Sequence, residues 1–266
     1  MNVNPFSQDD VQEVPLAPSP VEKVIVQISF PLSPELADLK NLGPLQKLLS
    51  PDYPILREEQ AVSLTFSSDG TSEQKVRNYF RFSAEDGRSS LSTGPSFLSI
   101  ELQDYRSRDA LAARFDKAVG HLVELDLVQR IDRLGIRYIN RLRDEDCSST
   151  RLRKLVSSPA LGAMTIASTL PETAPIDAAQ AQLTLNLGER KMQARWGHCP
   201  ANQQYGPGVG VVAEDSWVLD IDTFTDVPVA LDHNLVQELR SCAEVSYYFF
   251  RWVMSDSFID ERRNHD

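Results

Sequence analysis

The nonapeptide RLGIRYINR, residues 133–141, carries the clearest secondary-structure signal in the chain. Successive side chains of an extended strand point to opposite faces. One face therefore carries Arg133, Arg137 and Arg141, and the other carries Leu134, Ile136, Tyr138 and Leu142. This alternation is typical of a strand with one buried face, and we predict a long strand over residues 128–141.

The segments before this strand have the pattern of hairpins followed by one helix. Apolar, β-branched and aromatic runs predict strands at residues 24–30, 61–66, 77–83 and 97–102. Asp86-Gly87, which lies between two of these runs, is a hairpin signal. Ser107 is a typical helix N-cap, and the apolar residues after it keep helical spacing: Leu111, Phe115, Val119, Leu122 and Val123.

The second half of the chain repeats this order. Strands are predicted at residues 181–187, 191–196, 208–212 and 217–221, and a closing helix over residues 234–254. Because strands follow one another directly, the pattern favours an α+β fold with a mainly antiparallel sheet. We predict two similar lobes, residues 21–156 and 176–262, each closed by a long helix. Residues 1–20 read as a disordered leader, and one continuous domain is the alternative.

Composition restricts the class of partner. The 266 residues carry a formal net charge of −11, and a field of this sign repels phosphate. We therefore expect neither a nucleic acid nor a membrane as partner. Three widely spaced cysteines indicate reduced thiols rather than a disulfide framework, and the first 20 residues lack the regions of a signal peptide. These features predict a cytoplasmic protein.

The three arginines of the nonapeptide form a ladder on one strand face. Guanidinium groups in such an array can hold a phosphate or carboxylate bidentately, and Tyr138 and Asn140 lie beside them in the sequence. One hypothesis is a site for an anionic ligand made by these five residues. The alternative is that the arginines pair with carboxylates on neighbouring strands, for which the sequence offers Glu101, Asp104, Asp220 and Asp222.

Asp220 and Asp222 lie two residues apart and share one face of a predicted strand. Same-face carboxylates can bind a divalent cation or divide acid and base roles. The alternative is a solvated or arginine-paired strand face. The four histidines show no metal-ligand spacing. We therefore assign no cofactor, no metal ligand and no catalytic residue from the sequence.

The closing helix is apolar on more than one side. Its last turns contain Tyr247, Tyr248, Phe250 and Trp252, and a helix that is apolar nearly all round is either deeply buried or covered by a partner. Aromatic residues are also the favoured anchors of protein interfaces. We name these four residues as a candidate interface for a protein partner or a second copy of the chain, with core burial as the alternative.

Several segments in fixed order resemble a sporadically distributed bacterial family of uncharacterised proteins of about this length. The resemblance lies in Pro20–Val24 with Ile28–Phe30, in Tyr53-Pro54, in Gly135–Asn140, in Leu219–Asp222 and in Phe249–Ser255. It covers residues 20 to about 262. Lys23 stands where the family usually has an acid. The family has no assigned activity, so the resemblance implies no mechanism.

Three functions are consistent with these patterns. The first is a non-enzymatic binding or regulatory protein that acts through a protein partner or an anionic ligand, in an accessory role such as defence or a toxin–antitoxin pair. The second is a metal-dependent hydrolase or nucleotidyl enzyme that uses Asp220 and Asp222. The third is a homo-oligomeric assembly protein. We favour the first, because no catalytic pattern stands out.

Overall fold

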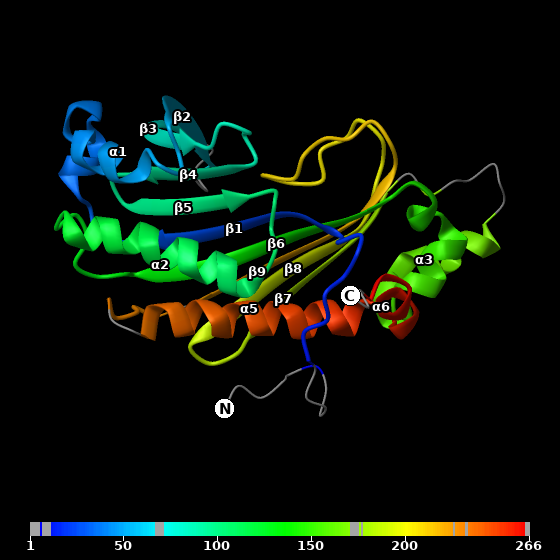
Figure 1. Ribbon diagram of the computed structural model, residues 1–266. Coiled ribbons are helices and arrows are strands. Elements are labelled where there is room, and N and C mark those ends of the chain that lie inside the picture. Colours follow the sequence, from blue (N-terminus) through cyan, green and yellow to red (C-terminus); the bar gives the residue numbers. More distant parts are fainter. Residues whose placement is uncertain are drawn as a thin grey trace. The chain divides into compact units, whose positions relative to one another are not determined.

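The computed structural model describes residue 6 and residues 12–66, 72–170, 176, 178–225, 227–231 and 234–263 (Figure 1). The chain divides into two compact units, each built from segments that are distant in sequence. We call residues 25–135 with 227–239 the hairpin unit, and residues 1–24, 136–226 and 240–266 the aromatic unit. Strands β1 (Val21–Ser29) and β6 (Arg133–Arg143) each begin in one unit and end in the other.

Four consecutive antiparallel strands form the sheet of the hairpin unit. They are β2 (Ile55–Phe66), β3 (Ser72–Ser83), β4 (Ser89–Gly94) and β5 (Phe97–Leu102). Gly87, in the turn between β3 and β4, has a φ of +69°, a left-handed conformation that glycine adopts at no steric cost. The hairpin predicted at Asp86-Gly87 is confirmed.

Two α-helices belong to the hairpin unit, α1 (Gly43–Leu49) and α2 (Arg108–Glu124), with short 3-10 helices at Pro34–Ala37 and Leu39–Asn41. The Ser107 hydroxyl accepts a hydrogen bond from the Ala110 amide at 3.1 Å, so the predicted N-cap of α2 is confirmed. The apolar stripe of α2, which includes Leu111, Phe115 and Leu122, is buried. The opposite, polar stripe of this helix contributes to the cavity described below.

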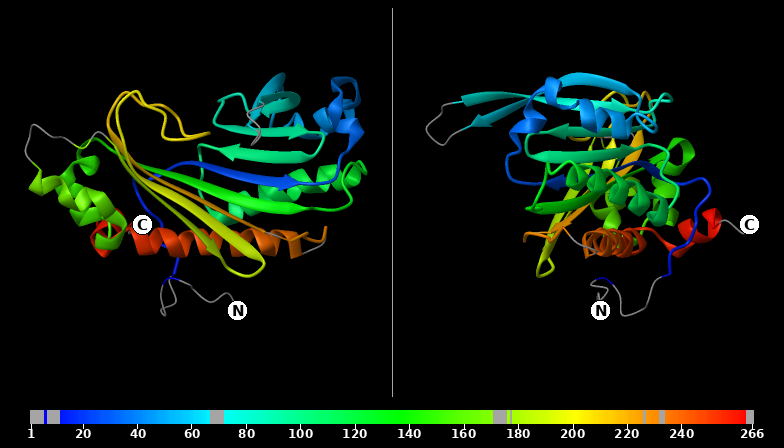
Figure 2. Two further views of the ribbon diagram at one scale, coloured as in Figure 1. Left: turned by 180° about the vertical axis from the view of Figure 1, so that it is seen from behind. Right: turned by 60° about the vertical axis from the view of Figure 1, so that its left-hand side comes forward.

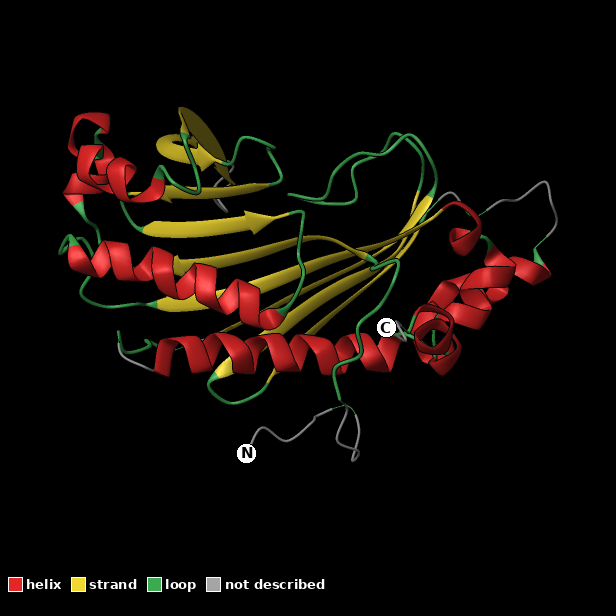
Figure 3. Cartoon of the chain, in the orientation of Figure 1, coloured by secondary structure: helices red, strands yellow, loops and turns green. Residues whose placement is uncertain are grey.

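The sheet of the aromatic unit has the order β6-β9-β8-β7. Its last three strands are antiparallel: β7 (Ala179–Asn186), β8 (Arg190–Cys199) and β9 (Ser216–Thr225). The helices are α3 (Ser149–Leu155), α4 (Ser158–Leu161), α5 (Asn234–Val253) and α6 (Asp256–Arg262), with 3-10 helices at Asp144–Cys147 and Gly162–Thr169 (Figure 3). Residues 240–253 of α5 belong to this unit.

One face of this sheet packs against α5 (Figure 2). The strands contribute Met192, Ala194, Trp196, Leu219 and Ile221, and the helix contributes Val245, Phe249 and Val253. Every second residue of β8 and β9 thus packs against residues of α5 that are four positions apart. Because the apolar positions face the helix, the alternate positions of the same strands place a set of polar side chains on the other face.

The α+β class with an antiparallel sheet is confirmed by these strand pairs. The boundaries of the two units differ from those of the sequential lobes predicted above, and the two-lobe arrangement stays a prediction. The strand predicted at residues 208–212 is wrong, since this segment is a loop. Gly208, with a φ of +76°, does not fit a strand. No helix within the described ranges is long and apolar enough to cross a membrane.

Candidate functional site

Arg137, in the middle of the predicted arginine ladder, is bound to a buried aspartate. Its Nε donates to Oδ1 of Asp220 at 2.6 Å, and its Nη2 donates to Oδ2 at 2.9 Å. The same Nη2 donates to the carbonyl of Pro207 at 2.7 Å. Burial lowers the pKa of Arg137, but the hydrogen bonds to Asp220 outweigh this effect and raise it. Arg137 therefore pairs with a carboxylate on another strand, Asp220, as the second of the two hypotheses proposed.

Asp220 is shared by two arginines. Besides the Arg137 fork, its Oδ2 accepts from Nη2 of Arg195 at 2.8 Å, and only 3% of the Asp220 side chain is exposed. Both carboxylate oxygens of Asp220 thus accept hydrogen bonds from guanidinium cations. The part of the chain that the structure describes contains no group of three or more His, Cys, Asp or Glu residues that could hold a metal ion.

Arg141 is a structural residue. Only 1% of its side chain is exposed, and its Nε forms an ion pair with Glu22. Nη1 donates to the Ser216 hydroxyl at 2.8 Å, and Nη2 donates to the Gly210 carbonyl at 2.6 Å. All three nitrogens therefore bind the chain itself. Together with Arg137, this residue fastens the loop at residues 206–210, which explains why that segment does not pair as a strand.

The other three residues of the predicted ligand site lie apart from this arrangement. Asn140 is buried and donates from Nδ2 to the Leu219 carbonyl at 3.2 Å. Tyr138 is partly buried on β6. Arg133 belongs to the hairpin unit, whereas Arg137 and Arg141 belong to the aromatic unit. A single site made by all five residues stays a hypothesis, and Arg137 is the member that lines a small polar cavity beside Arg195.

The four aromatic residues proposed as an interface differ in burial. Tyr248 and Phe250 are 6% and 7% exposed within the chain. Phe250 packs edge-on against Phe258 of α6, with ring centroids 6.0 Å apart. Tyr247 and Trp252 are only partly buried, and both contact the N-terminal segment.

This N-terminal contact involves residues predicted as a disordered leader. Residues 1–5 and 7–11 of that leader lie outside the described residues, but Phe6 and residues 12–20 are described. The Phe6 ring lies 5.2 Å from that of Phe249 and 6.4 Å from that of Trp252. The Tyr247 hydroxyl accepts from the Val14 amide at 2.9 Å and donates to the Gln12 carbonyl at 3.0 Å. The chain thus covers part of the candidate interface itself.

Replacing Phe6 with alanine removes both ring contacts. Aromatic pairs contribute about 0.5–1.5 kcal/mol beyond the area they bury, so we expect F6A to lower the free energy of unfolding by about 1–2 kcal/mol. Urea denaturation followed by tryptophan fluorescence measures this change. Gln12→Ala is the matched control, because it keeps the carbonyl that Tyr247 binds. An unchanged midpoint in F6A would show that Phe6 adds nothing to the fold.

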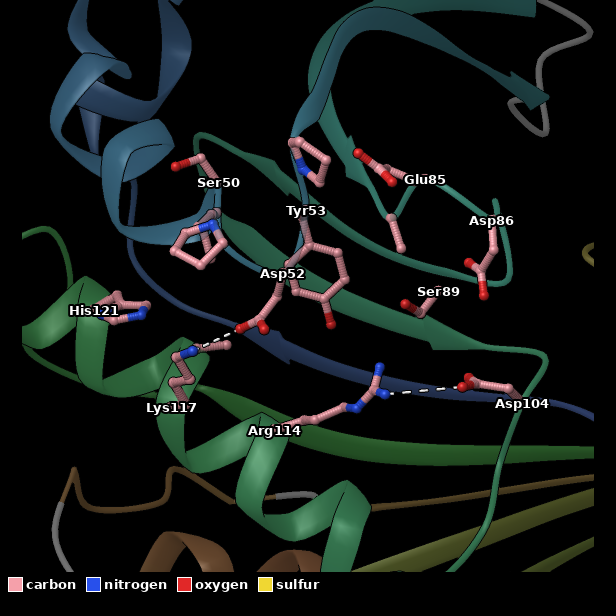
Figure 4. A pocket seen from close by; sticks show the side chains of 15 residues that line it. Ser50, Asp52, Tyr53, Glu85, Asp86, Ser89, Asp104, Arg114, Lys117 and His121 are labelled. Atoms are coloured by element: carbon pink, nitrogen blue, oxygen red, sulfur yellow. Dashed lines mark hydrogen bonds and ion pairs between the residues drawn. The ribbon is translucent and has the colours of Figure 1, made fainter.

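A concavity of the hairpin unit is shown in Figure 4. Its volume is about 590 Å³, within the range of small-molecule sites. We call it the Tyr53 cavity. Its walls are the segment after α1, the β3–β4 turn, the start of β4, the segment after β5 and one side of α2. The labelled polar residues are Ser50, Asp52, Tyr53, Glu85, Asp86, Ser89, Asp104, Arg114, Lys117 and His121.

Two charge pairs lie in the wall of this cavity. Nζ of Lys117 contacts Oδ2 of Asp52 at 2.6 Å, whereas Nη2 of Arg114 is 3.8 Å from Oδ2 of Asp104. Both basic residues come from α2, where a spacing of three residues places them on one helix face. In Figure 4 the ring of Tyr53 lies between the two pairs. Burial raises the pKa of the Tyr53 hydroxyl, and the charge of Arg114 opposes this shift; the phenol is therefore neutral at pH 7.

Two buried polar atoms of the wall have no hydrogen-bond partner among the described residues. They are Oδ1 of Asp104 and Nε2 of His121. The other ring nitrogen of His121, Nδ1, is 3.8 Å from the carboxylate of Glu124. Leaving a buried polar atom unpaired costs about 1–3 kcal/mol. Both residues belong to the lining of the same cavity.

The charge of the lining selects the kind of ligand. The cavity has four acids (Asp52, Glu85, Asp86 and Asp104) and two permanent cations (Arg114 and Lys117), an excess of two negative charges when His121 is neutral. Acceptor groups therefore predominate. A ligand rich in amine or hydroxyl donors fits this lining better than a free anion does.

Little in the sequence indicated this cavity. Its residues come from five segments between Leu49 and His121, and none forms a recognised motif. Asp104 was considered only as a partner for the arginine ladder, and it forms an ion pair with Arg114 instead. The one usable signal was the helical spacing of Arg114, Lys117 and His121, which places three bases along one side of α2. The opposing acids could not be placed without the register of the hairpins.

Comparisons with known proteins give no family for this chain. A scan against protein-family models finds no match, and a search of curated proteins finds no match either.

Proposed function

We propose that the protein binds a small polar ligand in the Tyr53 cavity, and that it acts by binding rather than by catalysis. The observation that carries this proposal is that two lining residues of one cavity of about 590 Å³, Asp104 and His121, each have a buried polar atom with no hydrogen-bond partner among the described residues. Amine or hydroxyl groups on the ligand would donate to Asp104. The ring of Tyr53 would pack against its carbon skeleton.

Thermal denaturation with a panel of probes tests this function. Spermidine and glucosamine represent amine-bearing ligands, glucose a neutral polyol and inorganic phosphate an anion. We expect an amine-bearing probe to raise the melting temperature, since a ligand at 100 times its Kd stabilises the native state by about 2.7 kcal/mol. Asp104→Asn should abolish this shift, because the amide removes the negative charge and replaces one acceptor with a donor.

A matched variant shows whether the effect of Asp104→Asn comes from the cavity or only from the loss of one negative charge nearby. Asp116→Asn removes an exposed acid of α2 that lies outside the cavity lining, and should keep the full ligand response. If phosphate alone stabilises the protein, and D104N does not alter that response, the proposed amine-binding cavity is wrong. The anionic ligand predicted from the sequence would then be the better account.

The remaining expectations from the sequence belong to the same proposal. A binding protein of this kind would be cytoplasmic and of bacterial type, with a protein partner or a second copy as its downstream contact. The two-lobe arrangement would assign α2 and α5 as the closing helices of the respective lobes. The partial exposure of Tyr247 and Trp252 supports a partner contact at the end of α5.

A further inference from the structure

Strand β7 is the last strand in the sheet order of the aromatic unit. It pairs with β8 along one of its edges. Within the described ranges, the backbone of residues 179–186 has no hydrogen bond outside this pair, including none to the nearby 3-10 helix Gly162–Thr169. Among the described residues, the second edge of β7 is therefore unpaired. An edge of this kind accepts a further strand through its amide and carbonyl groups.

The hairpin turn between β7 and β8 shows which amides face the open edge. The Leu187 amide donates to the Arg190 carbonyl at 2.9 Å, so these two residues form the hydrogen-bonded pair at the turn. Positions of an antiparallel pair alternate between hydrogen-bonded and non-hydrogen-bonded. Counted back along the register of the two strands, the odd-numbered residues of β7 bond to β8. The residues that direct their amides and carbonyls to the open edge are Gln180, Gln182, Thr184 and Asn186.

The side chains of β7 alternate between apolar and polar. Ala181, Leu183 and Leu185 pack against the core of the aromatic unit but are only partly buried. The even-numbered side chains point to the opposite face and are exposed. Because the sheet ends at this strand, the apolar row has a neighbouring strand on one side only. A further strand with the same alternation would cover the other side of the row.

Strand β7 lacks the features that keep edge strands apart. Its sequence, AQAQLTLN, contains no charged residue and no proline, and charges and prolines are the usual protection of an open edge. The terminal strand of the hairpin unit, β2, differs in this respect, since its first five residues include Arg57, Glu58 and Glu59. Two copies of a chain with a net charge of −11 repel each other. An uncharged strand is where they can approach with the least repulsion.

In one antiparallel register, β7 is complementary to itself. When Leu183 of one copy lies opposite Leu183 of a second copy, Gln182 lies opposite Thr184, and Gln180 lies opposite Asn186. All the amides and carbonyls that face the open edge then pair, which gives about eight backbone hydrogen bonds. A register shifted by two residues leaves outward-facing groups of each copy unpaired.

The same register brings the two apolar rows together. Ala181 lies opposite Leu185 of the second copy, and the two Leu183 side chains meet at the centre. These are non-hydrogen-bonded positions, at which the Cα atoms approach to about 4.5 Å and the side chains are closest. The apolar core of each aromatic unit would continue across the contact. Because the contact is two-fold, it uses the edge of each copy once and closes at two copies.

We propose that the protein forms a two-fold dimer through β7, in which the sheets of two aromatic units join into one. The partner is a second copy of the chain, and the contact is made by strand residues rather than by the aromatic end of α5. The proposal rests on the open edge, the register and the charge of β7. It does not depend on the ligand proposed for the Tyr53 cavity, which lies in the other unit.

Light scattering coupled to size-exclusion chromatography, over a range of protein concentrations, tests the dimer. We expect the wild type to have twice the chain mass of 29.8 kDa. Thr184→Pro should have the mass of a single chain at the same concentrations. Proline removes an amide that faces the open edge and leaves the hydrogen bonds to β8 in place. Circular dichroism and the urea midpoint show whether T184P keeps the fold.

A matched pair of double variants tests the register. In Q182E/T184E, like charges lie opposite each other across the contact, whereas in Q182E/T184K opposite charges do. Both variants carry the same change opposite Arg195 of β8, so they differ only at position 184. We expect the dissociation constant of the dimer to be at least about tenfold higher for Q182E/T184E than for Q182E/T184K.

Four results would overturn the proposal. One is a wild type with the mass of a single chain at every concentration. A dimer that persists in a folded T184P would place the contact elsewhere, such as at the aromatic residues of α5. Equal dissociation constants of the two double variants would exclude the register, and this comparison decides the matter if T184P does not fold. A single-chain wild type that binds a synthetic peptide of residues 179–186 would show that the edge accepts a strand of another molecule but not a second copy.

Discussion

Asp220→Ala is expected to lower the free energy of unfolding of the aromatic unit by about 3–5 kcal/mol, the usual cost of removing one partner from a buried ion pair. Asp220 is 3% exposed and accepts from both Arg137 and Arg195. Without it, two guanidinium groups lie close together with no shared anion. The remaining partner of Arg137 at this point is the Pro207 carbonyl, which carries no compensating charge.

Tryptophan fluorescence is the appropriate measurement for this variant. All three tryptophans, Trp196, Trp217 and Trp252, belong to the aromatic unit, so a urea titration followed by fluorescence reports on that unit. Asp222→Ala is the matched control, since it removes a partly buried carboxylate two residues along the same strand. We expect it to change stability by less than about 1 kcal/mol. Equal effects of the two changes would contradict the special role of Asp220.

The arginine ladder shows how far a one-strand pattern can be interpreted. Alternation in residues 133–141 was enough to predict a strand, and β6 spans Arg133–Arg143. Asp220 stood among four acids considered as partners, because oppositely charged residues on neighbouring strands commonly pair. Glu22, which pairs with Arg141, was not considered. It lies more than a hundred residues earlier in the sequence, and only the three-dimensional arrangement brings it to Arg141.

The loop at residues 206–210 shows the opposite case. Valine-rich sequence around Gly208 predicted a strand, yet the segment forms a loop that hydrogen-bonds to Arg137 and Arg141 through backbone carbonyls. β-Propensity reflects packing on a half-buried surface, and this segment has long-range arginine contacts instead. Local sequence carries no information about those contacts.

The closing helix was predicted well in extent but not in its surroundings. A helix over residues 234–254 was expected, and α5 spans Asn234–Val253. Its aromatic residues left burial and interface as alternatives. The structure adds a covering that neither alternative included, namely Phe6 against Phe249 and Trp252. The proline-bearing composition of residues 1–20 indicated disorder and gave no signal for this packing, because a single aromatic residue decides it.

The Tyr53 cavity marks the limit for site prediction. Each of its residues is ordinary in sequence, and its chemistry arises from hairpin turns and one side of α2 being brought together. An unpaired carboxylate oxygen such as Oδ1 of Asp104 is a property of packing, not of residue type. The same holds for the cavity beside Arg195, which depends on the register of β7, β8 and β9.

A change at Gly197 gives the sharpest test of that register. This residue has a φ of +146° on β8, where it lies opposite Gln180 of β7 and Val218 of β9. A Cβ atom there would be 1.9 Å from the Ala179 carbonyl oxygen and 2.9 Å from Cα of Gln180. Both are backbone atoms of the paired strand, so no side-chain rotation can relieve the clash.

Gly197→Ala is therefore expected to lower the free energy of unfolding by at least about 3 kcal/mol. The strain of a residue held in a glycine-only conformation accounts for about 1–3 kcal/mol. The separation of β7 from β8 that the clash requires adds to this strain. The matched control is Gly120→Ala in α2 of the hairpin unit, where a Cβ atom meets nothing within 4 Å and the better helix former should stabilise by about 0.5–1 kcal/mol. Fluorescence should report the loss in G197A, and far-ultraviolet circular dichroism the gain in G120A. If G197A unfolds at the same urea concentration as the wild type, the pairing of Gly197 with Gln180 is wrong. The register that places Gln182 opposite Arg195 would then be wrong as well.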